Sequence, residues 1–134
     1  MIWRRVLRAG PLAPILAVPL VLASAVTATA KVVDFQTPSK RIVCAYVTGV
    51  GARAFVRCDL RFLNDRAAVL EAGRKARKVK VTDAVGDPRS PVLAYGKSRS
   101  FGRFTCTSRT TGLTCRDRRS GHGFEVSRER QRLF

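Results

Sequence analysis

Four cysteines occur in two pairs, and strand-like runs flank each pair symmetrically around a short loop. Cys44 and Cys58 are equidistant from Gly51, which lies between two runs rich in aliphatic and aromatic residues. An antiparallel hairpin centred on Gly51 pairs residues of a single apolar face: Ile42 with Leu60, Cys44 with Cys58 and Tyr46 with Val56. The opposite face of the second run carries Arg57 and Asp59 outward. The same register therefore satisfies both the hydrophobic pattern and a disulfide bond.

The second cysteine pair supports the same interpretation, because Cys106 and Cys115 are symmetric about the Thr110–Thr111 bond. The corresponding hairpin pairs Phe104 with Asp117, Cys106 with Cys115 and Ser108 with Leu113. Residues directly opposite each other at a non-hydrogen-bonded site are about 4.5 Å apart at Cα, which suits a disulfide bond. Of the three connectivities open to four cysteines, only Cys44–Cys58 with Cys106–Cys115 fits two local hairpins.

A four-cysteine zinc site is the competing interpretation of these residues. Structural zinc sites usually present cysteines separated by about two to four residues. In this chain thirteen residues separate Cys44 from Cys58, and eight separate Cys106 from Cys115. We therefore predict two disulfides, no metal and no cofactor.

The rest of the sequence predicts a mainly β domain with one short helix. Asn64 is a suitable cap for a helix over residues 65–72, which Gly73 would end. Further strands are predicted at the end of residues 74–82, at 92–96 and at 121–126, with a turn over 86–91. Alternating basic and apolar residues at the end of the first of these segments are typical of an edge strand. Short strands with frequent turns indicate a small antiparallel sandwich or a barrel-like sheet.

The pattern of residues 1–30 predicts a secretory signal peptide, whose basic start comprises Arg4, Arg5 and Arg8. An uncharged apolar stretch over 12–26 follows, but prolines interrupt it, and it is shorter than the roughly 20 residues that span a bilayer. Small residues allow cleavage after Ala25, Ala28 or Ala30, and an uncleaved N-terminal anchor is the alternative. We expect residues 31–134 to form a single secreted domain, extracellular or in the cell envelope, where paired cysteines are oxidised.

The chain is strongly basic, with 26 Lys and Arg residues against 9 Asp and Glu residues and a net charge of +17. Loss of residues 1–30 would remove three arginines and no acid, which leaves a net charge of +14 on 104 residues. Such a charge favours polyanions, which outside a cell are envelope polymers, acidic glycans, anionic lipid headgroups or extracellular DNA. The predicted anion-binding residues form three clusters: Arg74, Lys75, Arg77, Lys78 and Lys80; Arg116, Arg118 and Arg119; and Arg128, Arg130 and Arg132. A basic surface that is merely solvated is the alternative, and the few interleaved aromatic residues argue against sequence-specific nucleic-acid recognition.

His122 is the only histidine, and it stands between Gly121 and Gly123 in a segment that predicts an exposed turn. An imidazole there could act as a base or a ligand, but no partner residue is evident. Oxidised cysteines argue against a Cys–His pair, and no serine lies in a nucleophile-elbow pattern. We therefore predict a protein that is not an enzyme, with a hydrolase using His122 as the alternative.

Two non-catalytic functions fit these features. The first is a monomeric extracellular or envelope-associated module with weak polyanion binding, whose partner is an anionic envelope polymer. The second is a protein–protein interaction module, such as an inhibitor or an adhesin-like domain, because loops on a rigid scaffold often carry function. The loops over residues 48–53 and 118–123 are the candidates for such contacts.

Several short segments carry a further signal: Phe35-Gln36-Thr37-Pro38-Ser39, Ile42-x-Cys44, Val56-Arg57-Cys58-Asp59, 91–96, Phe104-x-Cys106-Thr107-Ser108, 111–115 and 121–128. Together they resemble a family of small exported actinobacterial proteins, the domain-of-unknown-function family 6636. The chain departs from that family in having Lys40-Arg41 where members usually have Gly-Asn. It also lacks a further cysteine pair that members usually carry in the middle, which implies a looser middle. The resemblance implies export and a disulfide framework, and it implies no activity.

Overall fold

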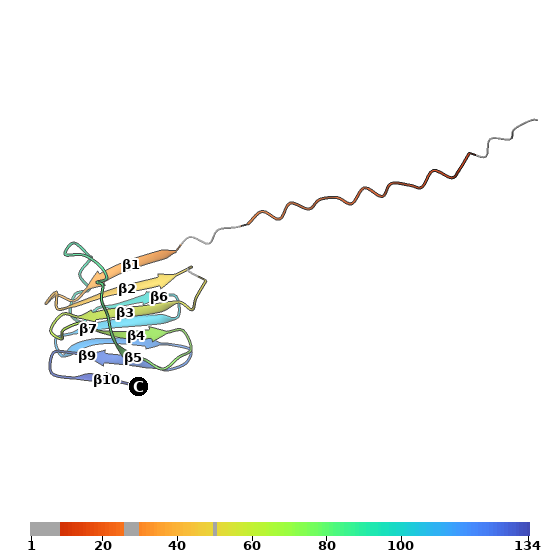
Figure 1. Cartoon of the computed structure of the whole chain (residues 1–134). Helices are drawn as coiled ribbons and strands as arrows, with labels where there is room; N and C mark the ends of the chain where they lie inside the picture. The colour runs from red at the N-terminus through yellow and green to blue at the C-terminus, as the bar shows by residue number, and fades with distance from the viewer. Residues whose placement is uncertain (1–8, 26–29, 50) are drawn as a thin grey trace, which may run out of the picture.

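The computed structural model describes residues 9–25, 30–49 and 51–134, and within them ten strands form two five-stranded antiparallel sheets. Sheet A has the order β1-β2-β3-β4-β5, with β1 (Lys31–Gln36), β2 (Ile42–Thr48), β3 (Phe55–Leu60), β4 (Arg66–Glu71) and β5 (Arg77–Lys80). Sheet B has the order β10-β9-β8-β7-β6, with β6 (Ser98–Phe101), β7 (Phe104–Arg109), β8 (Gly112–Asp117), β9 (Gly123–Val126) and β10 (Gln131–Leu133). Each strand pairs with its neighbours in sequence, so both sheets are meanders (Figure 1).

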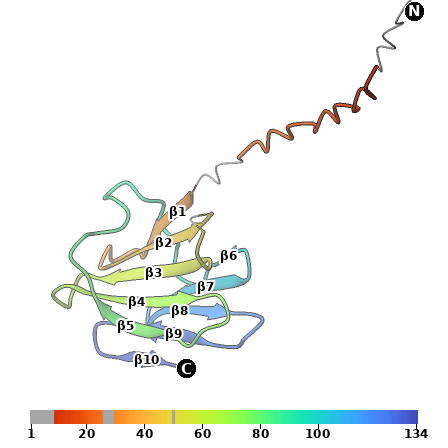
Figure 2. The ribbon, with the colours of Figure 1, turned by 45° about the vertical axis from the view of Figure 1, so that its right-hand side comes forward.

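The two sheets face each other as a sandwich, and the hydrophobic core lies between them (Figure 2). The largest buried side chains come from both sheets: Phe35, Leu60 and Leu70 from sheet A, and Phe104, Leu113 and Phe124 from sheet B. Full burial of each such side chain is worth about 1.5–3 kcal/mol, so packing between the sheets is a main source of stability. β1 and β5 are the edges of sheet A, and β6 and β10 are the edges of sheet B. The sandwich is therefore confirmed, and the barrel-like alternative is wrong.

Both predicted hairpins are confirmed in their register. β2 and β3 pair Ile42 with Leu60, Cys44 with Cys58 and Tyr46 with Val56. β7 and β8 pair Phe104 with Asp117, Cys106 with Cys115 and Ser108 with Leu113. The two disulfides join the predicted partners, with Cα separations of 4.0 Å in the first and 4.1 Å in the second. All four cysteines are buried in the core, and closing loops of this length contributes roughly 3 kcal/mol each.

The predicted helix over residues 65–72 is wrong, because these residues form β4. Asn64 and Asp65 belong to the preceding turn, in which Asp65 has a φ of 51°, and they do not cap a helix. β4 pairs with β3 on one edge and with β5 on the other. Four consecutive residues of β4 are buried, namely Ala67, Ala68, Val69 and Leu70. Pairing on both edges and burial of both faces override the helix propensity of this alanine-rich and leucine-containing segment.

The other strand predictions are confirmed only in part. β5 and β9 lie in the predicted segments 74–82 and 121–126, and β5 is an edge strand as expected. Residues 92–96 do not form a strand, since Val92 makes only an isolated parallel bridge with Gln36. β1, β6 and β10 were not predicted, because their short polar and apolar mixtures carry little periodicity.

The connection between β5 and β6 covers the outer face of sheet A. The amide of Val85 in this connection donates to Asp59 Oδ2 over 3.0 Å. Arg57 lies beside Asp59, and its Nε donates to Asp59 Oδ1 over 2.8 Å while its Nη1 donates to Asp83 Oδ1 over 2.9 Å. Arg57 and Asp59 do face away from the core, as predicted, but their side chains are only 13% and 12% exposed. Residues 83–85 therefore act as a strap, which the sequence pattern did not reveal.

Residues 9–25 extend away from the sandwich, and their side chains are exposed (Figure 1). Within the ranges that the structure describes, no helix is both long enough and apolar enough to cross a membrane. Arg4, Arg5 and Arg8 of the predicted signal peptide lie outside the described residues, as do positions 26–29 at the predicted cleavage region. The signal peptide therefore stays a prediction.

Candidate anion-binding cleft

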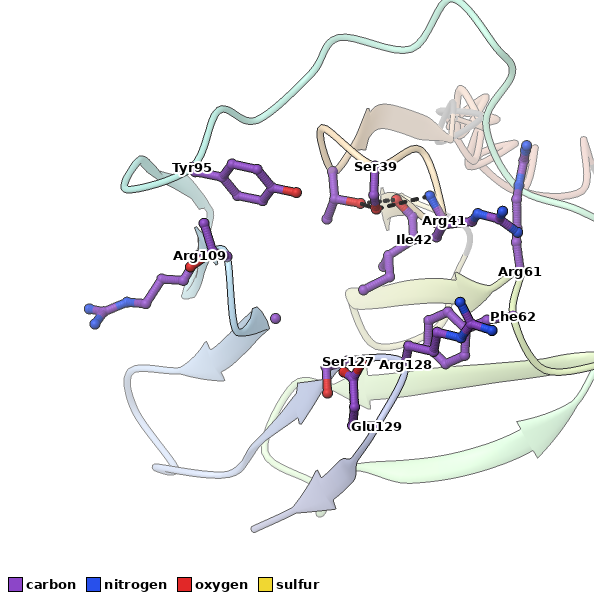
Figure 3. A pocket seen from close by; sticks show the side chains of 13 residues that line it. Ser39, Arg41, Ile42, Arg61, Phe62, Tyr95, Arg109, Ser127, Arg128 and Glu129 are labelled. Carbon is purple, nitrogen blue, oxygen red and sulfur yellow. Dashed lines mark hydrogen bonds between the residues drawn. The ribbon is translucent and has the colours of Figure 1, made fainter.

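A cleft of about 510 Å³ opens at one end of the sandwich (Figure 3). Because strands of an antiparallel meander alternate in direction, every second hairpin loop emerges at the same end. The cleft is lined by residues of four such loops, β1–β2, β3–β4, β7–β8 and β9–β10, and by Tyr95 from the β5–β6 connection. Segments from both sheets and from nearly the whole length of the domain therefore contribute to one site.

Arg41, Arg61 and Arg128 lie together on one side of this cleft (Figure 3). They come from three different loops, and all three are exposed. Ion pairs among the described residues join carboxylates to five other arginines, and none of them involves these three. A guanidinium group binds carboxylate or phosphate through a planar pair of N–H donors. Three such groups without a neutralising carboxylate form a site suited to an anion from solution.

Hydrogen-bonded turns hold two of the three arginines in place. The amide of Arg41 donates to Ser39 Oγ over 3.3 Å, and Ser39 Oγ lies 3.1 Å from Thr37 Oγ1. In the β9–β10 loop, which carries Arg128, the amide of Arg130 donates to Ser127 Oγ over 3.1 Å. The Ser127 amide donates back to the Arg130 carbonyl over 2.7 Å. These turns limit the freedom of the backbone beneath the guanidinium groups.

The remaining lining is mixed in character. Tyr95 is 47% exposed, and its hydroxyl points into the cleft (Figure 3). Arg109 contributes to the opposite wall, but its side chain extends away from the cleft (Figure 3). Ile42 and Phe62 supply apolar surface, and Glu129 is the one carboxylate among the lining residues. The cleft thus combines basic groups with an aromatic ring, hydroxyls and a single acid.

Of the predicted anion-binding residues in the three basic clusters, only Arg128 lines the cleft. Arg74 and Lys75 lie in the β4–β5 loop, and Arg118 and Arg119 lie in the β8–β9 loop. Strand alternation places both of these loops at the end opposite the cleft. The structure therefore places these four residues of the first two predicted clusters at one end of the sandwich, away from Arg128, whereas Lys80 lies at the other end of β5, opposite Arg66.

Several of the predicted residues have structural partners. Arg74 Nε lies 3.8 Å from Glu71 Oε2, and Arg77 Nη2 lies 2.7 Å from Glu71 Oε1. Arg118 donates to the carbonyls of Phe104 and Gly102. Arg132 Nη2 donates to Glu125 Oε2 over 3.1 Å. The side chains of the others form no hydrogen bond within the described part of the chain: Lys75, Lys78, Lys80, Arg116, Arg119, Arg128 and Arg130. Part of the basic surface thus serves the fold, and the anion-binding role of the remainder stays a prediction.

Asp117 organises the end opposite the cleft. Its side chain is completely buried, its Oδ1 accepts from Arg103 Nε over 2.8 Å, and its Oδ2 accepts from the Gly73 amide over 2.9 Å. Oδ1 also accepts from the Arg119 amide over 2.9 Å. Burial by itself raises the pKa of Asp117, but the hydrogen bonds from Arg103, Gly73 and Arg119 outweigh it and hold the pKa well below its ordinary value.

The Gly121-His122-Gly123 segment belongs to the turn that Asp117 caps. The carbonyl of His122 accepts from the Asp117 amide over 2.8 Å, and the His122 amide donates to Ser120 Oγ over 3.2 Å. His122 is half-buried. In the described residues, no group of three or more His, Cys, Asp or Glu side chains could hold a metal ion. These contacts give the segment a structural role, and the absence of a catalytic role for His122 stays a prediction.

Arg41, Arg61 and Tyr95 were not predicted as site residues from the sequence. Arg41 has only Lys40 beside it, Arg61 stands between Leu60 and Phe62, and Tyr95 is uncharged, so a search for longer runs of charge passes over all three. A signal was nevertheless present, because the correctly predicted β2–β3 and β7–β8 registers imply which loops share an end. Extending that alternation to the β1–β2 and β3–β4 hairpins would have grouped Arg41 with Arg61 within one sheet. Their proximity to Arg128 depends on the packing of the two sheets, which the alternation does not specify.

Comparison with known proteins gives a family but no function. No curated protein and no solved structure matches the chain. The matching family is described as a family of unknown function, DUF6636, and its match begins at Ala52, so the similar segments before that residue lie outside it. Because the match extends over residues 52–134, which is more than half of the chain, this protein belongs to the family of unknown function DUF6636.

Proposed function

We propose that this protein is an exported, non-catalytic module that binds an anionic polymer, and that the cleft arginines make the contact. The observation that carries this proposal is the convergence of Arg41, Arg61 and Arg128 from three loops without a carboxylate paired to any of them. Because like charges repel, the electrostatic repulsion among the three arginines is smallest when an anion lies between them. Hydrogen bonding to an ionised group also makes each contact stronger than a neutral one.

The overall charge supports the same proposal. A net charge of +14 on residues 31–134 raises the local concentration of anions around the whole domain. Exposed charges are screened over a Debye length of about 8 Å at physiological ionic strength. Binding should therefore weaken steeply as salt is added, with the remaining basic surface steering the polymer toward the cleft.

Export is part of the proposal. Two buried disulfides suit an oxidising compartment, and the uncharged residues within 9–25 suit the apolar part of a signal peptide. Expression in an actively secreting bacterial host, followed by mass spectrometry of the mature N-terminus, tests it. We expect a start directly after Ala25, Ala28 or Ala30. Recovery of only the full-length chain from the cell fraction would contradict export.

Heparin chromatography tests the binding with two variants that change the charge equally. The cleft variant carries Arg41→Gln, Arg61→Gln and Arg128→Gln, and the control carries Lys75→Gln, Lys78→Gln and Lys80→Gln. We expect the cleft variant to bind at least tenfold more weakly and with a smaller salt slope, while the control stays close to the wild type. Equal weakening of the two variants would show that net charge alone binds heparin. Passage of the wild type through the column at low salt would overturn the proposal.

A protein–protein interaction module is the second candidate, and one observation favours it. Among the described residues, Arg53 of the predicted contact loop 48–53 and the Asp117 turn that begins loop 118–123 both contact the β4–β5 loop at the end opposite the cleft. Arg53 Nη1 donates to the Ala72 carbonyl over 3.3 Å, and the Gly73 amide donates to Asp117 Oδ2 over 2.9 Å. A pull-down from culture supernatant would favour this candidate if one stoichiometric partner were lost in Arg119→Glu but kept in the cleft variant.

A further inference from the structure

We infer that the cleft recognises a sugar ring that carries an acidic group, such as a carboxylate or a phosphate. This inference rests on the proposed anion-binding function and specifies the chemistry of the ligand. It arises from three features of the cleft that simple attraction of negative charge does not explain: its size, the exposed ring of Tyr95 and the carboxylate of Glu129.

The size of the cleft favours a compact unit over an extended surface. Its volume of about 510 Å³ falls within the range of about 300–1,000 Å³ that is typical of small-ligand sites. A flat bilayer or the backbone of a long duplex contacts broad exposed surfaces instead. A few linked sugar rings of a polymer, inserted between the loops, would fit a cleft of this volume.

Tyr95 supplies an exposed aromatic face at a well-anchored position. The residue lies in a turn closed by the Lys97 amide, which donates to the Ala94 carbonyl over 3.1 Å, and Gly96 follows with a φ of 79°. The turn is tied to the sandwich on its far side, where the Gly96 amide donates to the Ser108 carbonyl over 2.7 Å. An amphipathic ring held in this way can cover the apolar face of a sugar while its hydroxyl bonds to a ring substituent.

Glu129 favours a sugar over an anion that has no hydroxyl groups. It lies next to Arg128 in the cleft lining, and its carboxylate forms no ion pair or side-chain hydrogen bond within the described ranges. A carboxylate at this position repels an anion that offers it no hydrogen-bond donor. The same carboxylate accepts hydrogen bonds from sugar hydroxyls, and the hydroxyls of Tyr95 and Thr110 offer further donors and acceptors. The arginines then bind the acidic substituent.

Isothermal titration with matched probes tests this inference. The probes are oligogalacturonate, a neutral oligosaccharide of the same length, and oligoglutamate of the same charge. We expect the wild type to bind oligogalacturonate at least tenfold more tightly than either of the others. A phosphorylated oligosaccharide as a fourth probe shows whether the preferred acidic group is a carboxylate or a phosphate.

Three variants identify the groups involved. Tyr95→Ala should lower the affinity for oligogalacturonate about tenfold and leave the affinity for oligoglutamate unchanged. Tyr95→Phe should retain most of the ring contribution. Glu129→Gln should raise the affinity for oligoglutamate, because it removes a repelling charge. Both positions are exposed, so thermal melting of all three variants is expected to remain close to that of the wild type.

The outcomes separate this inference from the function on which it rests. Equal binding of oligogalacturonate and oligoglutamate, unaffected by Tyr95→Ala, would overturn the recognition of sugar and leave anion binding by the arginines intact. Failure of every anionic probe to bind, together with no retention on heparin, would overturn both.

Discussion

Asp117 of β8 joins the two sheets of the sandwich through Gly73, whose amide in the β4–β5 loop donates to Asp117 Oδ2 over 2.9 Å. The same carboxylate is completely buried and accepts from Arg103 Nε over 2.8 Å through its other oxygen. One side chain thus links a loop of sheet A to the β6–β7 and β8–β9 loops of sheet B. A buried carboxylate with this many donors is costly to replace, because its partners lose their acceptor without regaining water.

Substitution Asp117→Asn is therefore expected to destabilise the fold by about 2–3 kcal/mol. The amide retains the shape of the carboxylate, but one of its two ends cannot accept from Arg103 or Gly73. Urea denaturation followed by fluorescence or circular dichroism measures the loss. Asp65→Asn is the matched control, since Asp65 is exposed in a turn and should change stability by less than about 0.5 kcal/mol. Similar stability of the two variants would argue against the role of Asp117.

The same residue predicts a loss of stability in acid. The hydrogen bonds hold the pKa of Asp117 in the folded protein below the ordinary value of 3.8. The unfolded chain therefore binds a proton before the folded protein does, so the contribution of Asp117 is complete above this value and declines as the pH falls below it. The free energy of unfolding of the wild type should decrease between about pH 5 and pH 2. The decrease should be smaller in Asp117→Asn, and parallel curves for the two proteins would exclude Asp117 as its source.

The strap over sheet A depends on Arg57, which donates to Asp59 and to both the side chain and the carbonyl of Asp83. Arg57→Ala should release residues 83–85 and leave Asp59 as a poorly paired, largely buried carboxylate. We expect faster hydrogen exchange of the Val85 amide and a loss of about 1–3 kcal/mol in the free energy of unfolding. Arg89→Ala, an exposed change in the same connection, is the control and should leave both measurements near wild type. Unchanged exchange at Val85 in Arg57→Ala would show that the strap is held by other contacts.

Local patterns predicted the two hairpins well, and the reason is physical. A cysteine pair, an apolar face and a central turn must agree in a single register, and a shift by one residue would turn every side chain to the other face. The sequence positions therefore predicted both disulfides correctly, Cys44–Cys58 and Cys106–Cys115. The helix over residues 65–72 failed because propensity is weak compared with pairing to two neighbouring strands. Nothing within that segment reveals that β3 and β5 lie on either side of it.

The candidate site was likewise predicted only where local sequence was sufficient. Arg128 was predicted because it stands in a short basic cluster near other arginines, whereas Arg41, Arg61 and Tyr95 were not predicted. The latter three are far from Arg128 in sequence, and they gather at one end only after the strands alternate within each sheet and the two sheets pack together. Conversely, Arg74 and Arg77 look like free charges in the sequence, but both pair with Glu71 after folding.

The amino-acid sequence by itself determined the β class of the domain, the two hairpin registers, the disulfide partners and the excess of positive charge, because these depend on residues close together in the chain or on composition alone. Only the tertiary structure decided that β4 is a strand, that the strap covers Arg57, and which arginines at the cleft form no ion pair with a carboxylate. Those outcomes depend on the neighbours that each segment acquires across the sandwich. Those neighbours are set by the packing of the whole chain, and no single segment contains enough information to predict that packing.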